Sequence, residues 1–174
     1  MINELIGQDQ LKKRLSFYTQ SKKATGVIPF LMFNGAKGLG KTEFAKAFAK
    51  TLNKPMIEIN CSTIRNAEQF FEQIFVPAIL DKDVTILFDE AHALPNDLVM
   101  SMFATTELDK LFPPFRDRLT VLDFVPYSTE ELARIMCKKI SWVNFDDSVM
   151  TEIAGTLRGN ARSAIKRALE IRAY

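Results

Sequence analysis

The feature that most constrains this chain is the octapeptide at residues 35–42, which reads G-x-x-x-x-G-K-T. An apolar run at 27–33 precedes it and a helical pattern at 43–49 follows, so the octapeptide joins a predicted strand to a predicted helix. Backbone N–H groups of such a turn converge on phosphate oxygens, and the helix N-terminus adds positive partial charge there. The pattern therefore favours a P-loop that binds a nucleoside triphosphate over a glycine-rich turn with a chance Lys-Thr pair.

The residues of this loop have separate expected roles. Lys41 is expected to reach the β- and γ-phosphates, and the Thr42 hydroxyl is expected to bind Mg²⁺. The residues predicted to contact the nucleotide in this segment are Gly38, Leu39, Gly40, Lys41, Thr42 and Glu43.

A pair of carboxylates follows a second apolar run. Residues 84–88 read as a buried parallel strand, and Asp89 and Glu90 come directly after it. Ligands bind outside the carboxyl ends of strands in open α/β sheets. Asp89 is predicted to hold Mg²⁺, directly or through water, and Glu90 to orient and deprotonate the attacking water. A strand followed by Asp-Glu is also a common helix start, but the upstream P-loop favours the functional interpretation.

The order of the predicted elements indicates an α/β fold. Strands that alternate with helices imply a parallel sheet with helices on both faces, here of the P-loop NTPase type. After residue 127 the pattern becomes helical only, opened by a Ser128 capping box. We predict an α/β nucleotide-binding core at 1–127 and a helical lid at 128–174. The expected strands are 27–34, 56–60, 84–88 and 119–124, and the expected helices are 8–22, 43–52, 66–77, one starting at 128, 147–156 and 160–173.

Bulk composition narrows the class of protein. The chain has 174 residues and a net charge of +2, which is too small to argue for or against nucleic acid. No apolar run approaches the ~20 residues of a membrane span, so no membrane association is expected. Cys61 and Cys137 lie far apart without a partner motif and are interpreted as reduced, buried thiols. We expect a cytoplasmic protein.

Further polar residues carry weaker signals. Thr105 and Thr106 end a short apolar run, where a side chain at a strand tip can bond the γ-phosphate; an ordinary strand end is the alternative. Arg116 and Arg118 precede a predicted strand, and guanidinium groups stabilise phosphoryl transition states, although such clusters are ordinarily solvated patches. Arg162 begins a helix from which an arginine can reach back to the nucleotide.

The string from Asp89 to His92 also occurs in superfamily-2 helicases. Those need a second motor domain of similar size, for which this chain has no room. His92 is interpreted as a polar residue near the Mg²⁺ site rather than a metal ligand or a catalytic base.

Taken in this order, the motifs resemble those of AAA+ ATPases, and specifically the RuvB family of Holliday-junction branch-migration motors. The resemblance extends over essentially the whole chain, and its later segments are more specific than the Walker motifs. The segments that carry it are Leu5-Ile6-Gly7-Gln8 (the adenine-contacting box), Gly38-Leu39-Gly40-Lys41-Thr42 (Walker A), Asp89-Glu90-Ala91-His92 (Walker B), Ala104-Thr105-Thr106 (sensor 1), Phe115-Arg116-Asp117-Arg118 (arginine finger), Tyr127-Ser128-Thr129-Glu130-Glu131-Leu132 (lid start) and Arg158-Gly159-Asn160-Ala161-Arg162 (sensor 2).

This resemblance implies a homo-oligomeric ring, a hexamer, with ATP and Mg²⁺ bound between subunits. It implies that Leu5 and Ile6 contact adenine, that Thr106 is the sensor 1 residue, and that Arg162 acts in cis. Arg116 or Arg118 completes a neighbour's site in trans, and the choice between them stays open.

Three functional interpretations follow from these motifs. The favoured one is an ATP-hydrolysing motor subunit that acts on DNA. A clamp-loader-like switch subunit is the second, and a nucleotide-dependent assembly factor that hydrolyses little ATP is the third. The intact Glu90 and arginines argue against the third, since an ATP-bound scaffold has no need of them.

The chain also departs from the family pattern. Ala36-Lys37 replaces two prolines in the P-loop, and Ala161 stands where the family has proline. No winged-helix DNA-binding domain follows the lid, so DNA contact is expected through a region absent from this chain or through another subunit.

The last departure is a short connection between the carboxylate pair and the sensor 1 segment. Crossing back over a five-residue strand as a helix takes about ten or eleven residues before a new strand begins, and 91–106 barely suffices. The family carries a partner-docking β-hairpin in this region. We predict that a stretch is missing between Met100 and Phe103.

Overall fold

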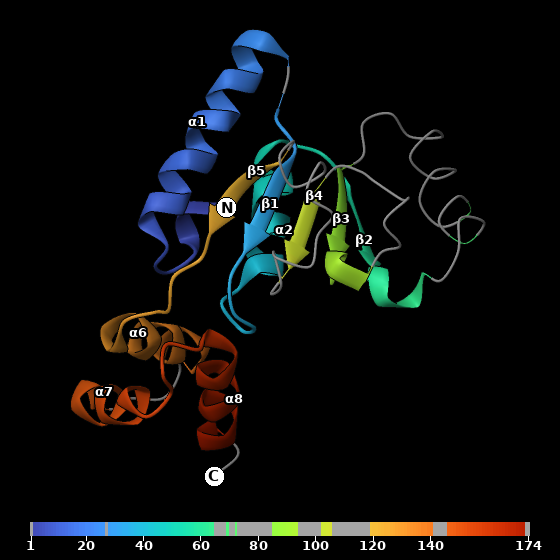
Figure 1. The fold of residues 1–174 in the computed structure, drawn as a ribbon. Helices are drawn as coiled ribbons and strands as arrows, with labels where there is room; N and C mark the ends of the chain where they lie inside the picture. The colour runs from blue at the N-terminus through green and yellow to red at the C-terminus, as the bar shows by residue number, and fades with distance from the viewer. Residues whose placement is uncertain are drawn as a thin grey trace.

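The computed structural model describes residues 2–26, 28–64, 69, 72, 85–93, 102–105, 119–140 and 146–172 (Figure 1). Its strands are β1 (Leu31–Asn34), β2 (Met56–Asn60), β3 (Thr85–Asp89), β4 (Met102–Thr105) and β5 (Thr120–Asp123). Its α-helices are α1 (Asp9–Thr25), α2 (Lys41–Thr51), α6 (Thr129–Lys139), α7 (Asp147–Gly155) and α8 (Ala161–Arg172), with 3₁₀ turns η1 (Ile2–Glu4), η2 (Cys61–Thr63) and η4 (Ala91–Ala93).

The described strands form one five-stranded sheet in the order β2-β3-β4-β1-β5. Every pairing is parallel, and β1 lies between β4 and β5, with Leu31 paired to Met102 on one side and Thr120 on the other. The prediction of a parallel α/β sheet is confirmed. Because the strands are parallel, their carboxyl ends share one edge of the sheet, and the arrows of β1, β3 and β4 point toward α6–α8 (Figure 1).

Alternating side chains of β1 enter two different hydrophobic clusters. Leu31 and Phe33 belong to the cluster that contains Phe44 and Phe48 of α2, and Met32 belongs to a second cluster with Phe88. All six side chains are almost fully buried, and each contributes about 1.5–3 kcal/mol by leaving water. Burial on both faces explains why β1 is a continuous apolar run.

The helix α2 covers the face of the sheet that Leu31 and Phe33 line, and Figure 1 shows it behind β1 and β4. The predicted helix at 66–77, a candidate for the other face, lies almost entirely outside the described residues. The connection at 94–101, where a missing stretch was predicted, lies outside them as well.

Two element boundaries differ from prediction. The strand β1 begins at Leu31 rather than at 27, because Pro29 lacks the N–H that a ladder needs. The helix α1 continues to Thr25 instead of stopping at 22, and ends where Gly26 takes a left-handed conformation and its N–H donates to the Lys22 carbonyl over 2.8 Å.

We call the helices α6, α7 and α8 the C-terminal bundle. The predicted capping box opens α6: the Ser128 N–H donates to a Glu131 carboxylate oxygen over 2.8 Å, and the Glu131 N–H donates to the Ser128 hydroxyl over 3.2 Å. The helices expected at 147–156 and 160–173 are present as α7 and α8. Figure 1 shows the bundle at the carboxyl edge of the sheet. The division of the chain at residue 127 stays a prediction.

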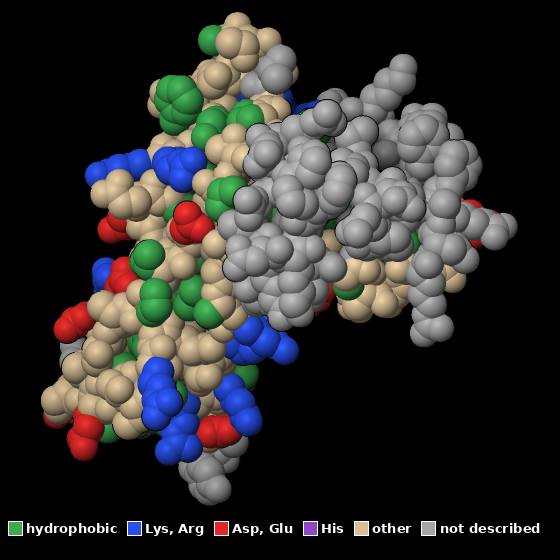
Figure 2. Space-filling model, in the orientation of Figure 1, with side chains coloured by type: hydrophobic (Ala, Val, Ile, Leu, Met, Phe, Trp, Pro, Cys, Tyr) green, Lys and Arg blue, Asp and Glu red, His purple; other side chains and the backbone are tan. Residues whose placement is uncertain are grey.

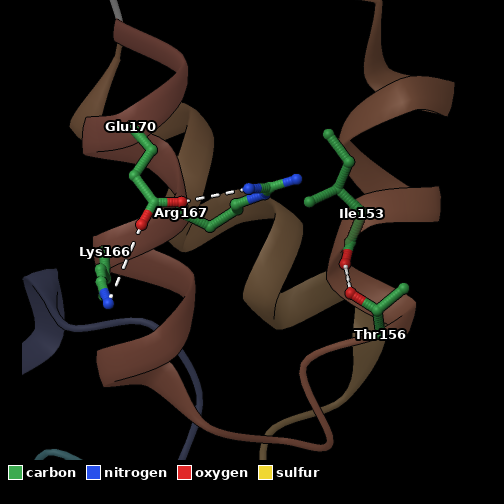
Figure 3. Close-up of polar contacts among 5 residues, drawn as sticks. All are labelled: Ile153, Thr156, Lys166, Arg167 and Glu170. Atoms are coloured by element: carbon green, nitrogen blue, oxygen red, sulfur yellow. Dashed lines mark hydrogen bonds and ion pairs between the residues drawn. The ribbon is translucent and has the colours of Figure 1, made fainter. Parts of the chain in front are cut away.

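The surface of the C-terminal bundle is charged. On α8, one carboxylate, Glu170, pairs with Arg167 at 3.1 Å and with Lys166 at 3.9 Å, and at the end of α7 the Thr156 hydroxyl donates to the Ile153 carbonyl over 2.7 Å (Figure 3). Such exposed pairs contribute roughly 0–1 kcal/mol each. Figure 2 shows Lys and Arg side chains gathered over this part of the molecule. Among the described helices, none is both long and apolar enough to cross a membrane.

Candidate functional site

A cavity of about 540 Å³ opens at the carboxyl edge of the sheet, where the loop after β1 meets the start of α2. Segments from all parts of the sequence contribute to it. Its lining consists of Lys37, Gly38, Gly40, Lys41, Thr42, Glu43, Glu58, Asn60, Asp89, Glu90, Ala161, Arg162 and Ile165. The cavity thus brings together the predicted P-loop, the predicted carboxylate pair and Arg162.

Lys41 is the charged group at the floor of this cavity. Only 8% of its surface is exposed, and its ammonium donates to the carbonyls of Gly35 at 2.7 Å and Ala36 at 3.0 Å. Burial lowers the pKa of Lys41; the negative charges of Asp89 and Glu90 oppose that shift and Arg162 adds to it. Each of these groups is therefore close enough to Lys41 to affect its charge. A cation held by loop carbonyls can transfer its bonds to an anion that enters the loop.

The turn at Glu90 lets two consecutive carboxylates face one cavity. Adjacent residues of a strand point to opposite faces, but β3 ends at Asp89, and Glu90 has a left-handed backbone with φ of 54°. The Glu90 N–H donates to an Asp89 carboxylate oxygen over 3.1 Å. A left-handed non-glycine residue costs about 1–3 kcal/mol, and such strain is concentrated at functional positions.

The donor set of the cavity fits Mg²⁺ bound together with phosphates. Thr42 and Asp89, the predicted metal ligands, both line it. Within the described part of the chain, no group of three or more His, Cys, Asp or Glu residues is arranged to hold a metal alone. Mg²⁺ typically takes one or two protein oxygens and completes its shell with phosphate oxygens and water. These residues are therefore suited to a metal that arrives with a polyphosphate.

A second cavity, of about 440 Å³, adjoins the first and shares Gly40, Glu43, Ala161 and Ile165 with it. Its lining is largely apolar, as a nucleobase requires. Leu5 and Ile6, the predicted adenine contacts, belong to it. The other residues around it are Glu4, Phe44, Tyr127, Ile135, Lys138 and Lys139. A polar cavity joined to an apolar one has the layout that a nucleoside triphosphate needs.

The N-terminal segment is fixed beside this second cavity by Gln8. Its side-chain amide donates to the Val125 carbonyl over 2.6 Å and accepts from the Val125 N–H over 3.2 Å. Both bonds are available because Gln8 carries a donor and an acceptor on one amide group. The arrangement attaches the predicted adenine-contacting box to the chain that leaves β5.

Sequence reasoning missed several residues of the two cavities. Asn60 ends β2, so the rule that ligands lie at carboxyl strand ends would have found it. Glu58 lines the cavity and pairs with Lys46 of α2 at 2.7 Å, and hydrogen bonding to Glu58 raises the pKa of Lys46. No local signal singled out Ile165 or Tyr127, because their places in the site depend on how the C-terminal bundle packs.

Some predicted site residues are not placed. Thr106, Arg116 and Arg118 lie outside the described residues, as does the side chain of His92. Their roles stay predictions. The strand β4 ends at Thr105, which pairs with Asn34, the last residue of β1 before the P-loop.

Two other outcomes concern the cysteines. Both are free thiols; Cys61 is buried beside the end of β2, as predicted, whereas Cys137, on α6, is only half-buried, contrary to the prediction. Burial, with a smaller contribution from the negative charge of Asp89, raises the pKa of Cys61 to about 12.

Comparison with known proteins shows what this chain is similar to. Residues 31–98 match the family described as "ATPase family associated with various cellular activities (AAA)". The chain is 30% identical to the Holliday junction branch migration complex subunit RuvB of Sulfurimonas denitrificans, covering 99% of this chain and 61% of that protein. It is 28% identical to the replication factor C small subunit of Methanococcus vannielii, covering 94% of this chain and 59% of the relative.

Solved structures show the same fold. The RuvB Holliday junction branch migration motor of Thermotoga maritima matches with a TM-score of 0.85 at 25% identity, over 97% of this chain and 62% of that one. A mutant of the same protein, P216G, matches with a TM-score of 0.87. The chain therefore spans about three-fifths of the length of the relatives it matches. The alignment with the Sulfurimonas protein runs over 207 positions against 174 residues here, so that relative carries internal residues without a counterpart.

Proposed function

Because this chain carries an AAA ATPase domain related to RuvB and to replication factor C, we propose that it is an ATP-hydrolysing subunit of a ring-shaped motor that acts on DNA. The observation that carries the proposal is the shared cavity. Lys41, Thr42, Asp89, Glu90 and Arg162 come from three separate segments and line one space of about 540 Å³.

In this proposal different residues of the chain bind the phosphates and activate the attacking water. The P-loop amides and Lys41 bind the β- and γ-phosphates, and Arg162 adds positive charge to the same cavity. Glu90 orients the attacking water and accepts its proton while the water oxygen bonds the γ-phosphorus and the bond to the β-γ bridging oxygen breaks. ADP and inorganic phosphate leave.

Thr42 and Asp89 would hold Mg²⁺ against the phosphates. When bound, the metal ion supplies positive charge that neutralises the phosphate oxygens. Leu5 and Ile6, with the apolar residues of the second cavity, would contact the adenine.

The proposed ring supplies a further charge. Arg116 or Arg118 would enter the site of a neighbouring subunit, where a guanidinium stabilises the transition state. An isolated subunit is then expected to turn over slowly. Motion of the C-terminal bundle relative to the sheet would pass to DNA through a region outside this chain or through another subunit.

The similarity to replication factor C supports a second candidate, a clamp-loader-like switch subunit. The two candidates differ in assembly with ATP, because a translocating motor of this kind forms a closed hexamer and a clamp loader forms a five-membered or mixed assembly. Mass measurement of the ATP-bound complex separates them. A scaffold that hydrolyses little ATP is the third candidate.

Two substitutions test ATP binding and turnover separately. Lys41→Ala removes the buried cation and is expected to abolish ATP binding measured by calorimetry. Glu90→Gln keeps the shape of the side chain and is expected to lower turnover about 10²–10⁴-fold while ATP still binds. Glu152→Gln, on the exposed surface of α7, removes the same charge away from the site and serves as the control. Equal turnover in wild type and Glu90→Gln would remove Glu90 from the mechanism, and DNA-independent turnover of the assembled ring would argue against the motor.

A further inference from the structure

Two carbonyl groups of the P-loop are bonded to the start of α8. The side-chain amide of Asn160 donates to the Lys37 carbonyl over 2.9 Å. The backbone N–H of Arg162 donates to the Gly38 carbonyl over 3.2 Å. Consecutive carbonyls of the loop are thus held by two donors from the C-terminal bundle, more than 120 residues further along the chain.

The Asn160 amide makes this contact while it also caps α8. Its oxygen accepts the Ser163 N–H over 3.1 Å, which satisfies one of the unpaired N–H groups at the start of that helix. Its nitrogen is the group that reaches the loop. An amide offers a donor and an acceptor from one rigid plane, so a single side chain connects the helix end to the loop.

The two segments are in close contact. A Cβ added to Gly38 would lie 2.2 Å from the Asn160 side-chain oxygen, so the amide rests directly against the loop backbone. The segment before Asn160 is fixed as well, because the Tyr127 N–H donates to the Gly159 carbonyl over 3.1 Å. The bond therefore joins two parts that are each anchored.

Holding these carbonyls determines where the loop N–H groups point. In a planar trans peptide the C=O and the N–H point in opposite directions. A Lys37 carbonyl held toward Asn160 thus turns the Gly38 N–H away from α8, and a Gly38 carbonyl held toward Arg162 does the same for the Leu39 N–H. A phosphate-binding loop requires this arrangement, with N–H groups facing the anion and carbonyls facing outward.

We propose that Asn160 is a positioning residue that preorganises the phosphate-binding loop, so that nucleotide affinity depends on contact between the C-terminal bundle and the loop. The proposal rests on the proposed function, since it assumes that the loop binds a nucleotide phosphate. It extends that function by assigning a role to Asn160, the residue that caps α8 and bonds the loop. When the C-terminal bundle moves away, the loop loses two hydrogen-bond donors and its affinity for the phosphates falls.

Asn160→Ser separates positioning from folding. Serine caps helices about as well as asparagine, so the stability of α8 is retained, but its shorter side chain ends before the Lys37 carbonyl. The matched control is Asp146→Ala, which removes the cap of α7, where Asp146 accepts the Ser148 N–H over 2.9 Å away from the loop. The measurements are the Kd values for ADP and ATPγS by calorimetry and the Tm by circular dichroism.

Asn160→Ser is expected to weaken both Kd values about three- to tenfold at an unchanged Tm, as the loss of one hydrogen bond predicts. Asp146→Ala is expected to lower the Tm and leave the Kd values unchanged. If Asn160→Ser binds as tightly as wild type, or if Asp146→Ala weakens binding equally, the positioning role is overturned. Lys41→Ala, measured in the same assay, tests the proposed function itself. If Lys41→Ala binds nucleotide as tightly as wild type, the loop does not bind phosphate, and both the proposed function and the proposed role of Asn160 are wrong.

Discussion

The hydroxyl of Tyr127 provides the sharpest test of how the two parts of the site are joined. Tyr127 is 7% exposed, and its hydroxyl donates to the Leu39 carbonyl of the P-loop over 3.1 Å. Tyr127→Phe keeps the ring and removes only the donor. The buried Leu39 carbonyl then has no partner for this bond, which costs about 1–3 kcal/mol of unfolding free energy. For a domain of this size that cost lowers the Tm by roughly 2–4 °C per kcal/mol.

The pKa of the same hydroxyl gives the prediction a pH dependence. Burial raises the pKa of Tyr127 to about 12, partly offset by a hydrogen bond with Gln8. An unfolded tyrosine ionises near pH 10. Between about pH 10 and 12 the unfolded state therefore holds fewer protons than the folded state, and wild-type stability falls as the pH rises. The loss amounts to about 1.4 kcal/mol at pH 11, and Tyr127→Phe does not show it.

The assay is urea unfolding of both proteins, followed by circular dichroism at pH 8 and pH 11. The free-energy difference between them is expected to be about 1–3 kcal/mol at pH 8 and to shrink by about 1.4 kcal/mol at pH 11. Other titrating groups, including Cys61, are common to both proteins and cancel in the difference. Equal stability at pH 8, or a difference that stays constant between the two pH values, would show that the hydroxyl does not make this buried bond.

Two further outcomes follow from local geometry. Gly159→Ala is expected to lower the free energy of unfolding more than Gly26→Ala does. Both glycines have left-handed backbones, which cost a non-glycine residue about 1–2 kcal/mol, but only at Gly159 does the new Cβ lie 2.6 Å from Pro126, which adds about 1–3 kcal/mol of steric overlap. Equal Tm values for the two variants would contradict the close packing at Gly159. In a Cys137→Ser background, Cys61 is expected to resist Ellman's reagent at pH 8 until the protein is unfolded. Its raised pKa keeps the thiol protonated, and its side chain is buried. Rapid labelling of Cys61 in the folded protein would contradict this prediction.

Local patterns in the sequence were sufficient to predict the strand, loop and helix and the carboxylate pair that line the larger cavity. The strand before the P-loop, the helix after it and the carboxylate pair each have a short-range signature, and the capping box at Ser128 is another. These features are predictable because their cause is local: a helix needs a cap, a phosphate loop needs amides at a helix start, and a buried strand needs an apolar run. Boundaries were less accurate where a single residue overrides the pattern, as Pro29 does before β1.

The residues that join the C-terminal bundle to the loop were not predictable in the same way. Asn160 reads locally as an ordinary helix cap, and nothing nearby in the sequence indicates that its nitrogen faces Lys37. Tyr127 reads as a residue before a helix, although its hydroxyl bonds the P-loop. The strand order also depends on contacts between distant segments, because β4 inserts between β1 and β3. Such features follow from packing, which no short window of sequence contains.

Three hydrogen-bonded contacts between segments far apart in the sequence connect the P-loop to the rest of the chain. Gln8 bonds the Val125 backbone, Tyr127 bonds Leu39, and Asn160 bonds Lys37. The Asn160 bond is lost when the C-terminal bundle moves relative to the sheet, and the Tyr127 bond holds the chain that leads into that bundle against the loop. The loop is therefore not an independent phosphate cradle. Its geometry depends on the start of α8 and on the chain leaving β5, which Gln8 holds in turn, so a ligand that stabilises the loop also stabilises the relative position of these segments.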